Sequence, residues 1–331
     1  MPHRIGEGTR YRHSGTVDGT ESHHSARCRA DRHEELSMRV FVTGASGHIG
    51  SAVVEELTGA GHEVLGLARS DASAAVVSAL GGEVRRGDFA DTAALRDAAR
   101  EADAVVHLAF DHATMTAGDF AGAAATDLGV VRTIGDALAG TGKALLGVGM
   151  TPTGDPATDA VIAANPRSAV SRALAAYTER DVRVVHVAIP PVTHSARDTT
   201  GFLPTLIGIA RARGVSGYLG EGANRWPAAH VQDVARLYRL AVEKAPAGAQ
   251  LHAATEPGVP VREIAERIAL HLGIPARGVP AERAAAHFRG FPFIGLDLTM
   301  PNDSTRTLLG WTPSHPGVLG DLDAGHYFTT A

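Results

Sequence analysis

Three glycines, Gly44, Gly47 and Gly50, directly follow a short apolar run at residues 40–42. Glycine lets a backbone turn sharply and brings its N–H groups close to a ligand. The amphipathic pattern at residues 51–60 predicts a helix that begins at this turn. A helix N-terminus favours an anion because its first amides are unsatisfied and its macrodipole is positive there. The spacing therefore predicts a turn that holds a phosphate, as in dinucleotide sites.

A second apolar run, residues 62–68, ends at Arg69 and Ser70, with Asp71 one step later. In a βαβ dinucleotide fold this strand end lies beside the adenosine ribose. An acidic residue there accepts from the 2′-hydroxyl of NAD, whereas an arginine holds the 2′-phosphate of NADP. We therefore expect NADP rather than NAD, with Arg69 and Ser70 at the phosphate. The alternative is that Arg69 is one solvated arginine among many.

The elements that must position these residues alternate between strand and helix. Apolar runs predict strands at residues 40–42, 62–68, 82–86, 104–110, 143–148 and 182–189. Helical patterns lie between them, at residues 51–60, 72–80, 95–102, 126–138 and 168–180. This alternation predicts an α/β fold with a doubly wound parallel sheet of the Rossmann type. His107, inside the fourth strand, is interpreted as a core residue.

Beyond residue 190 the pattern is less regular, with helices expected at residues 202–213, 231–244 and 261–272 and a strand at 250–253. We expect residues 38–190 to form the dinucleotide-binding domain. Residues 191–331 are expected to form mainly a smaller substrate-binding lobe that is interleaved with it. Ligands of such sheets collect at the carboxyl ends of the strands.

Composition narrows the class of protein. The chain has 331 residues, a formal net charge of −5 and no long basic run, which disfavours a nucleic acid partner. It lacks an apolar run long enough to span a membrane. The single cysteine, Cys28, indicates a reducing compartment, so we expect a cytoplasmic protein. There are 17 histidines, yet none forms a spaced ligand pair on a convincing helix, so no metal is expected.

Residues 1–37 are rich in His, Arg, Ser and Gly and poor in apolar residues. Such a segment buries too little apolar surface to offset its ordering entropy, so we expect it to be disordered. Met38 immediately precedes the first strand, and we expect the functional chain to start there. The competing interpretation is a regulatory arm.

Residues 38 to about 328 resemble the short-chain dehydrogenase/reductase superfamily, in the extended or atypical branch that includes the NAD-dependent epimerase/dehydratase family. The resemblance rests on TGASGHIG at 43–50, GD at 87–88, HLA at 107–109, WPAAHVQDVA at 226–235, VREIA at 261–265 and LLGWTP at 308–313. These motifs are specific for the superfamily and not for one reaction. A homodimer is the family's expectation.

The resemblance implies a cofactor contact for each strand end. The turn around the pyrophosphate maps onto Gly44, Ser46, Gly47, His48, Ile49 and Gly50. The adenine contact maps onto Asp88 and Phe89, and the nicotinamide ribose contact onto Ala109 and Phe110. The loop near the carboxamide maps onto residues 190–193, with Pro190 and Val192 at the cofactor.

The family's usual catalytic pair is absent. Family members place Ser or Thr after the fifth strand and Tyr-x-x-x-Lys on the next helix, where lysine lowers the tyrosine pKa. Thr151 fills the first position, but no tyrosine is followed four residues later by lysine. Tyr177 is followed by Asp181 and is interpreted as a packing or surface residue. Some combination of Arg167, Ser168, Ser171 and Arg172 replaces the pair.

Proton transfer then needs another group. Thr151 can hydrogen-bond a carbonyl oxygen and Arg167 can stabilise negative charge, yet neither is a good proton donor near neutral pH. Histidine suits that role, and His112 and His194 are the candidates. His230 is a further candidate, although docking of the second lobe, together with Asp233, explains it at least as well.

Three functions remain open. The first is an NADP(H)-dependent reductase or dehydrogenase acting on a small carbonyl or hydroxyl substrate. The second is an epimerase, dehydratase or non-redox isomerase that keeps its nucleotide bound, and the missing Tyr/Lys pair counts against it. The third is a non-catalytic sensor of NADP.

Overall fold

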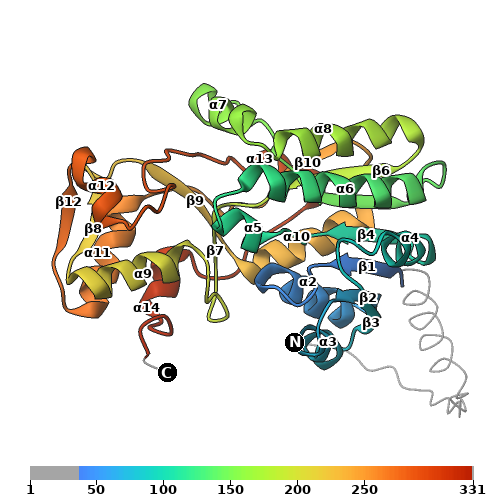
Figure 1. Ribbon diagram of the computed structural model, residues 1–331, viewed down its shortest axis with the longest axis horizontal. Helices are drawn as coiled ribbons and strands as arrows, with labels where there is room; N and C mark the ends of the chain where they lie inside the picture. Colours follow the sequence, from blue (N-terminus) through green and yellow to red (C-terminus); the bar gives the residue numbers. More distant parts are fainter. Residues whose placement is uncertain (1–36, 330–331) are drawn as a thin grey trace, which may run out of the picture. The chain divides into compact units, whose positions relative to one another are not determined.

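A seven-stranded parallel sheet lies at the centre of the fold, with strand order β10-β6-β5-β4-β1-β2-β3 (Figure 1). The computed structural model describes residues 37–329. The segment predicted to be disordered therefore lies, up to residue 36, outside the described residues. The strands are β1 (Arg39–Thr43), β2 (Glu63–Ala68), β3 (Glu83–Arg86), β4 (Ala104–His107), β5 (Ala144–Val148), β6 (Arg183–Ala188) and β10 (Ala249–His252). The predicted doubly wound sheet is confirmed.

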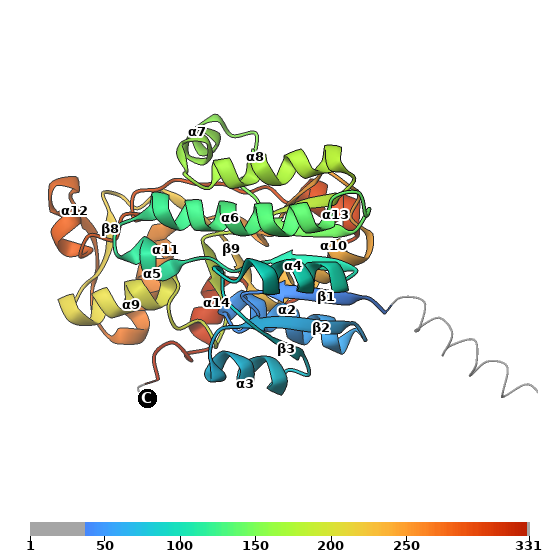
Figure 2. The same ribbon diagram turned by 45° about the vertical axis from the view of Figure 1, so that its right-hand side comes forward.

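Helices cover both faces of this sheet. One face packs on α2 (His48–Gly59), α3 (Asp71–Ala79) and α10 (Val231–Lys244). The other face packs on α4 (Thr92–Glu101), α6 (Phe120–Leu138) and α8 (Ser168–Ala176). Figure 2 shows α6 and α8 on one side of β1 and β2 and α3 on the other. The inner strands β1, β4 and β5 are rich in Val, Leu and Ala because both of their faces are buried, whereas the edge strand β3 is EVRR and has no buried residue.

Two elements from the C-terminal half complete the central sheet and its cover. β10 pairs in parallel with β6, in the register Ala249↔Val185, and becomes an edge strand. α10 packs against α2, the helix that follows the glycine turn. The two halves of the chain are therefore interleaved, because residues far beyond 190 supply part of the sheet and its cover.

The lobe has its own small sheets and core. A three-stranded sheet joins β11 (Glu256–Pro260), β9 (Arg225–His230) and β7 (Val192–His194), and a two-stranded sheet joins β12 (Ala276–Val279) and β8 (Ser216–Leu219). Around them lie α9 (Phe202–Arg213), α11 (Val261–Leu272), α12 (Ala281–His287) and α14 (Val318–Asp323). Trp226 is completely buried in the lobe core, and Phe202, Phe291 and Phe293 pack near it.

The remaining helices connect the two parts. They are α5 (His112–Thr116), α7 (Pro156–Ala164), α13 (Asp303–Leu309) and the 3₁₀ helix η1 (Tyr177–Arg180). None of the helices within residues 37–329 is long and apolar enough to cross a membrane.

Predicted and observed helix boundaries agree wherever local signals are strong. The bounds of α9, α10 and α11 match the expected ranges. α6 begins at Phe120 and not at residue 126, because Asp119 caps it by accepting from the Gly122 amide at 2.7 Å. The helix expected over 168–180 changes to η1 at Tyr177 and stops at Asp181, whose φ of 56° is left-handed.

Candidate functional site

The glycine turn between β1 and α2 has no room for side chains. Gly44 has φ +69°, and a Cβ on it would lie 2.8 Å from the Ala109 backbone nitrogen. A Cβ on Gly50 would lie 2.0 Å from the Gly44 carbonyl oxygen. The Gly47 amide donates to the Gly44 carbonyl at 3.0 Å and closes the turn. Close packing of backbone on backbone explains why each of these positions is glycine.

The start of α2 is open to an anion. Its N-cap, Gly47, makes no side-chain capping bond, and the first turn holds no acidic residue. Five other helices, α3, α4, α5, α6 and α7, have Ser or Asp caps that accept from their first amides. Ser46 and Ile49 flank the turn and are half-buried. The cradle and the uncapped amides together fit a dinucleotide pyrophosphate.

The carboxyl edge of β2 and β3 carries the residues expected at the adenosine. Arg69 is exposed directly after β2, and within the described part of the chain it forms no ion pair. Asp71 is paired with Arg86 from the end of β3. Ser70 caps α3 by accepting from the Ser73 amide at 3.2 Å. The Asp71 carboxylate is thus paired with Arg86, while the exposed Arg69 guanidinium is available to bind a 2′-phosphate.

Asp88 and Phe89 follow β3 at the same edge. One Asp88 carboxylate oxygen accepts from the Ala90 amide at 2.8 Å, and the side chain is exposed. Phe89 is half-buried and packs against the hydrophobic core that the sheet forms with α4 and α6. Both positions lie at the predicted edge, and their contact with adenine stays a prediction.

The end of β4 lies directly beside the glycine turn. Ala109 is buried, and its amide donates to the Thr43 hydroxyl at 3.3 Å. Phe110 is half-buried and contacts the His112 ring edge-on, with centroids 5.3 Å apart. The structure thus brings together the two strand ends at which the pyrophosphate and the nicotinamide ribose were predicted.

A hydrogen-bonded chain links this edge to the helix that should carry the catalytic pair. Thr43 Oγ1 lies 2.6 Å from His107 Nδ1, and His107 Nε2 lies 2.9 Å from Asp127 Oδ1. Asp127 Oδ2 accepts from Arg167 Nε at 3.0 Å, and the Arg167 guanidinium carbon lies 4.4 Å from the Phe110 ring centroid. His107 is buried with both ring nitrogens bonded, so the core interpretation is confirmed.

Asp127 is the member of this chain that the sequence did not single out. It is 3% exposed and lies on the inner face of α6. Burial acts to raise the pKa of Asp127, but the hydrogen bond and charge of His107, with those of Arg167, hold that pKa below its ordinary value. The sequence did contain a signal for this buried acid. Asp127 lies three or four positions from apolar residues on both sides, and this spacing places it on the apolar face of the helix, next to Ala123, Ala124, Val130 and Val131.

Thr151 follows β5 and has a buried hydroxyl without a partner. The side chain is 3% exposed, and Oγ1 has no hydrogen bond within the described residues. Its methyl group lies near Gly149, where a Cβ would be 3.2 Å from Thr151 Cγ2. A buried hydroxyl normally forms a hydrogen bond, so the Thr151 hydroxyl is a candidate to hydrogen-bond an oxygen of a ligand.

The start of α8 holds the residues that were predicted to replace the usual pair. Ser171 accepts from the Met150 amide at 2.8 Å and ties α8 to the loop of Thr151. Ser168 is buried and donates to the Ile162 carbonyl at 2.6 Å. Arg172 is exposed. Arg167 is therefore the cation of this turn that faces the end of β4.

His112 and His194, the two predicted proton donors, have different surroundings. His112 is exposed at the start of α5, and burial of its ring together with the charge of Arg167 lowers its pKa. His194 is completely buried, and its Nδ1 lies 2.8 Å from Asp321 Oδ2. His194 is thus bound into the lobe, and His112 is the histidine next to Phe110 and Arg167.

His194 belongs to a group that we call the junction cluster: His48, His194, Ser195, His230 and Asp321. His48 Nε2 lies 2.8 Å from Ser195 Oγ, and the rings of His194 and His230 meet edge-on at 5.5 Å. Burial, with the charges of Arg197 and the neighbouring histidines, lowers the pKa of His48 to about 4. The cluster joins the glycine turn to the lobe.

His230 and Asp233 perform the predicted docking. Asp233 is completely buried and accepts from the amides of Ser314 at 2.9 Å and His315 at 3.1 Å. His230 stacks on His315 with ring centroids 4.6 Å apart. These contacts hold the C-terminal segment against α10.

Three further predictions concern Tyr177, the segment after β6 and metal ligands, and the cofactor contact of that segment stays a prediction. Tyr177 is buried, and its hydroxyl donates to the Arg132 carbonyl at 3.1 Å, so the packing interpretation is confirmed. Pro190 and Val192 are buried where β6 leads into β7, and Val192 pairs with Ala228 in the lobe sheet. Residues 37–329 contain no group of three His, Cys, Asp or Glu side chains that could hold a metal ion.

Comparison with known proteins identifies a matching family and several relatives. Residues 40–145 match the model of the NAD dependent epimerase/dehydratase family. A Schizosaccharomyces pombe protein, "Uncharacterized protein C2A9.02", is 39% identical over 305 residues, which cover 88% of this chain and 100% of that protein. A ketoreductase of Stigmatella aurantiaca that acts on a 4-farnesyl-dihydroquinoline-1-oxide is 26% identical, covering 83% of this chain and 92% of the relative.

A solved structure supports the fold independently. The Thermus thermophilus UDP-glucose 4-epimerase, in complex with NAD, superposes with a TM-score of 0.68 at 21% identity, covering 88% of this chain and 99% of the epimerase. At that identity the likeness concerns the fold alone. Sequence motifs, sheet order, glycine cradle and relatives agree, and the chain belongs to the NAD-dependent epimerase/dehydratase family, within the extended short-chain dehydrogenase/reductase superfamily.

Proposed function

We propose that this protein is an NADP(H)-dependent oxidoreductase that acts on a small carbonyl or hydroxyl substrate without a Tyr/Lys pair. The observation that carries the proposal is the cradle of Gly44 and Gly50 at the uncapped start of α2. A ketoreductase among the relatives supports carbonyl chemistry over epimerisation. When bound, the nicotinamide ring supplies or accepts the hydride.

Thr151 and Arg167 take the role of binding the reacting oxygen. The buried, partnerless Thr151 hydroxyl donates to the substrate oxygen, because a ligand there satisfies it. Arg167 stabilises the negative charge that develops on this oxygen. Asp127 holds the guanidinium by accepting from Nε at 3.0 Å, so the cation is in place before the substrate binds. Preorganised charge of this kind needs no rearrangement during the reaction.

His112 is the proposed source of the proton, directly or through water. It contacts Phe110 at the edge where the nicotinamide ribose is predicted. The charge of Arg167 adds to burial in lowering the pKa of His112, which makes its protonated form a readier donor. His194 is bonded to Asp321 and is a positioning residue of the lobe.

NADP is the proposed form of the cofactor because of Arg69. This arginine has no ion pair within the described residues, whereas Asp71 is paired with Arg86. We predict that Arg69→Asp weakens NADPH binding at least about tenfold and improves NADH binding. Fluorescence titration of both nucleotides measures the change, with Arg306→Asp as the control on an exposed arginine of α13. An unchanged preference for NADPH would remove Arg69 from the cofactor site.

The activity is tested with a panel of small ketones and aldehydes and purified protein, following NADPH oxidation. We predict that Thr151→Val, which keeps the shape and removes the hydroxyl, lowers kcat about 10- to 1000-fold at unchanged NADPH affinity. The matched control is Thr133→Val on α6, whose hydroxyl donates to the Gly129 carbonyl of the same helix. NADPH binding without turnover on any carbonyl would favour the sensor, and failure to bind either nucleotide would overturn the proposal.

A further inference from the structure

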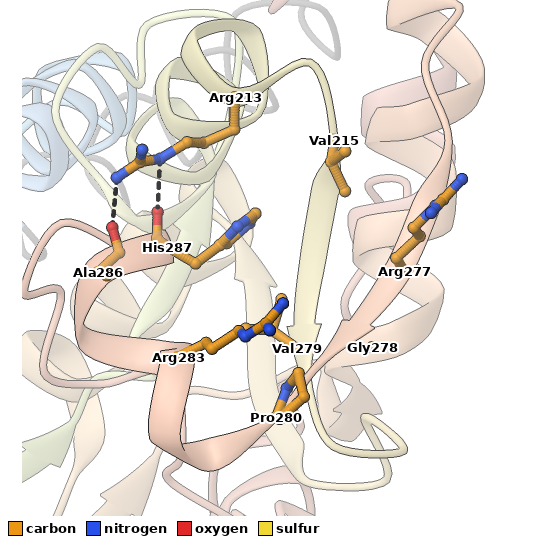
Figure 3. A pocket seen from close by; sticks show the side chains of 9 residues that line it. All are labelled: Arg213, Val215, Arg277, Gly278, Val279, Pro280, Arg283, Ala286 and His287. Atoms are coloured by element: carbon orange, nitrogen blue, oxygen red, sulfur yellow. Dashed lines mark hydrogen bonds between the residues drawn. The ribbon is translucent and has the colours of Figure 1, made fainter.

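A second concave site lies at the outer end of the lobe, formed by the end of α9, the strand β12 and the helix α12 (Figure 3). Its volume is about 350 Å³, within the range of about 300–1,000 Å³ of small-molecule sites. Its wall is largely apolar, built by Val215, Val279, Pro280 and Ala286. In Figure 1, β12 and α12 lie at the opposite end of the molecule from β1 and β2.

The charged side chains around this cavity all have one sign. Arg213, Arg277 and Arg283 line it, and no aspartate or glutamate does. Arg277 and Arg283 are exposed and form no ion pair within residues 37–329. Three other arginines of the lobe have carboxylate partners, namely Arg225 with Asp297, Arg262 with Glu266 and Arg267 with Asp323. The three side chains point in different directions in Figure 3, so they form a positively charged rim whose summed field attracts an anion.

Hydrogen bonds to the end of α12 fix the side chain of Arg213. Its guanidinium donates to the Ala286 carbonyl and, at 3.2 Å, to the His287 carbonyl, as the dashed lines in Figure 3 show. These bonds cap the end of α12 and hold the positive charge at the cavity wall. A pre-positioned arginine loses little freedom when a ligand binds.

His287 adds an unsatisfied polar atom to the same wall. Its Nε2 is buried and has no hydrogen-bond partner within the described chain. The ring lies close to β8, because a Cβ on Gly217 would come within 2.4 Å of Nε2. Burial, followed by the charge of Arg213, lowers the pKa of His287. A buried ring nitrogen of this kind is normally paired, and a ligand oxygen or a water is the remaining partner.

We propose that this outer cavity binds a phosphate monoester with a small apolar body, separately from the dinucleotide turn. Three arginines suit a dianion better than a monoanion, and guanidinium geometry matches phosphate oxygens. The apolar wall of Val215, Val279 and Pro280 accommodates a small ring or short alkyl group. The proposal goes beyond the proposed oxidoreductase activity and does not depend on it.

Phenyl phosphate is the test probe, titrated into the full chain at low ionic strength and followed by calorimetry and by amide shifts in NMR spectra. We expect saturable binding with the largest shifts at residues 277–287. Benzoate, a monoanion with the same ring, should bind more weakly, and inorganic phosphate should bind without the apolar contribution. Binding should weaken with added salt because the arginines are exposed.

Two variants separate this cavity from the rest of the surface. The double variant Arg277→Gln/Arg283→Gln should reduce phenyl phosphate affinity at least about fivefold. Arg306→Gln, an exposed arginine on α13 that forms no ion pair within the described residues, should leave it unchanged. Both changes lie on the surface, and equal thermal midpoints check that the fold is kept.

Three results would overturn the proposal. The first is that phenyl phosphate shows no saturable binding up to about 10 mM, which is well above the weak end of specific affinities. The second is that the double variant binds phenyl phosphate with unchanged affinity. The third is that saturating NADPH displaces phenyl phosphate. The last result would assign the anion to the dinucleotide turn. Loss of NADPH binding with phenyl phosphate binding retained would instead contradict only the proposed function.

Discussion

Asp127 is the charged residue in a buried helix face whose other members are Ala, Val, Ile, Gly and Leu. Its side chain is 1% exposed, and it pairs with His107 at 2.9 Å and with Arg167 at 3.0 Å. A buried carboxylate is tolerated when it is hydrogen-bonded to cations or other donors. At the scale of single residues, Asp127 thus connects the strand of His107 to the proposed cationic group of the active site.

We predict that Asp127→Asn lowers the free energy of unfolding by about 1–3 kcal/mol, because a buried charge-assisted network loses its anion. Urea denaturation measures this value. In the proposed reaction the same variant should lower kcat more than it raises KM, since Arg167 loses its fixed position. The control is Glu266→Gln, from an exposed pair with Arg262 on α11, which should cost less than about 1 kcal/mol. Equal effects of both changes would contradict a buried network.

At the scale of elements, the turn from β1 into α2 determines whether the molecule can hold a dinucleotide. Its geometry depends on backbone atoms in contact, as between Gly50 and the Gly44 carbonyl. The pattern of three glycines after an apolar strand predicted this geometry from local sequence alone. The prediction succeeded because a turn of this kind depends on residues that are adjacent in the chain.

We predict that Gly50→Ala abolishes detectable NADPH binding and lowers the thermal midpoint, because the new Cβ would lie 2.0 Å from the Gly44 oxygen. The matched control is Gly59→Ala in the same helix, where an added Cβ meets nothing within 4 Å. That change should leave NADPH affinity unchanged and be neutral or stabilising by up to about 1 kcal/mol. NADPH binding by the Gly50 variant would show that the turn is not the cofactor cradle.

At the scale of the whole molecule, the junction cluster and the contacts of α2 hold the two parts together. Glu55 on α2 accepts from Arg197 at 2.7 Å, and Glu56 accepts from Arg239 at 2.7 Å. His48 reaches Ser195 from the turn itself. The lobe is therefore attached directly beside the proposed cofactor site, and the homodimer expected from the family stays a prediction.

We predict that stability falls as the pH drops from about 6.5 toward 4. The pKa values of His48 and His230 are lowered from 6.5 to about 4, by burial first and then by neighbouring positive charges. The unfolded chain therefore binds protons before the folded protein does, so the stability present above pH 6.5 is lost through this window. For each histidine, the free energy of unfolding should change by less than about 1.4 kcal/mol per pH unit, because both rings are partly exposed.

His48→Gln isolates this effect. Thermal midpoints between pH 4 and 7 should fall less steeply in the variant than in the unchanged protein. Burial raises the pKa of Asp198, which acts in the opposite direction in the same window and is common to both proteins. His271→Gln, at the end of α11 and outside the junction cluster, is the control. Parallel curves for the protein and its His48 variant would contradict the prediction.

Much of the fold followed from the sequence because its signals are local. Short apolar runs predicted the six strands from β1 to β6, and helical patterns predicted the bounds of α9, α10 and α11. The start of α6 was predicted too late because its first turns are rich in alanine and glycine, whose pattern is weak. The placement of β10 at the edge of the main sheet depended on packing and could not be derived from its four residues.

The sequence by itself determined the parallel sheet, the glycine turn and the absence of a Tyr-x-x-x-Lys motif, because each depends on neighbours in the chain or on residue type alone. The tertiary structure decided which side chains meet. Arg167 and Asp127 are 40 residues apart, and His48 and Ser195 are 147 apart. Such pairs form only when the packing of helices on the sheet brings them together, and no local period records that distance. For this reason the glycine turn was predictable, whereas Asp127 and the junction cluster were found only in the folded molecule.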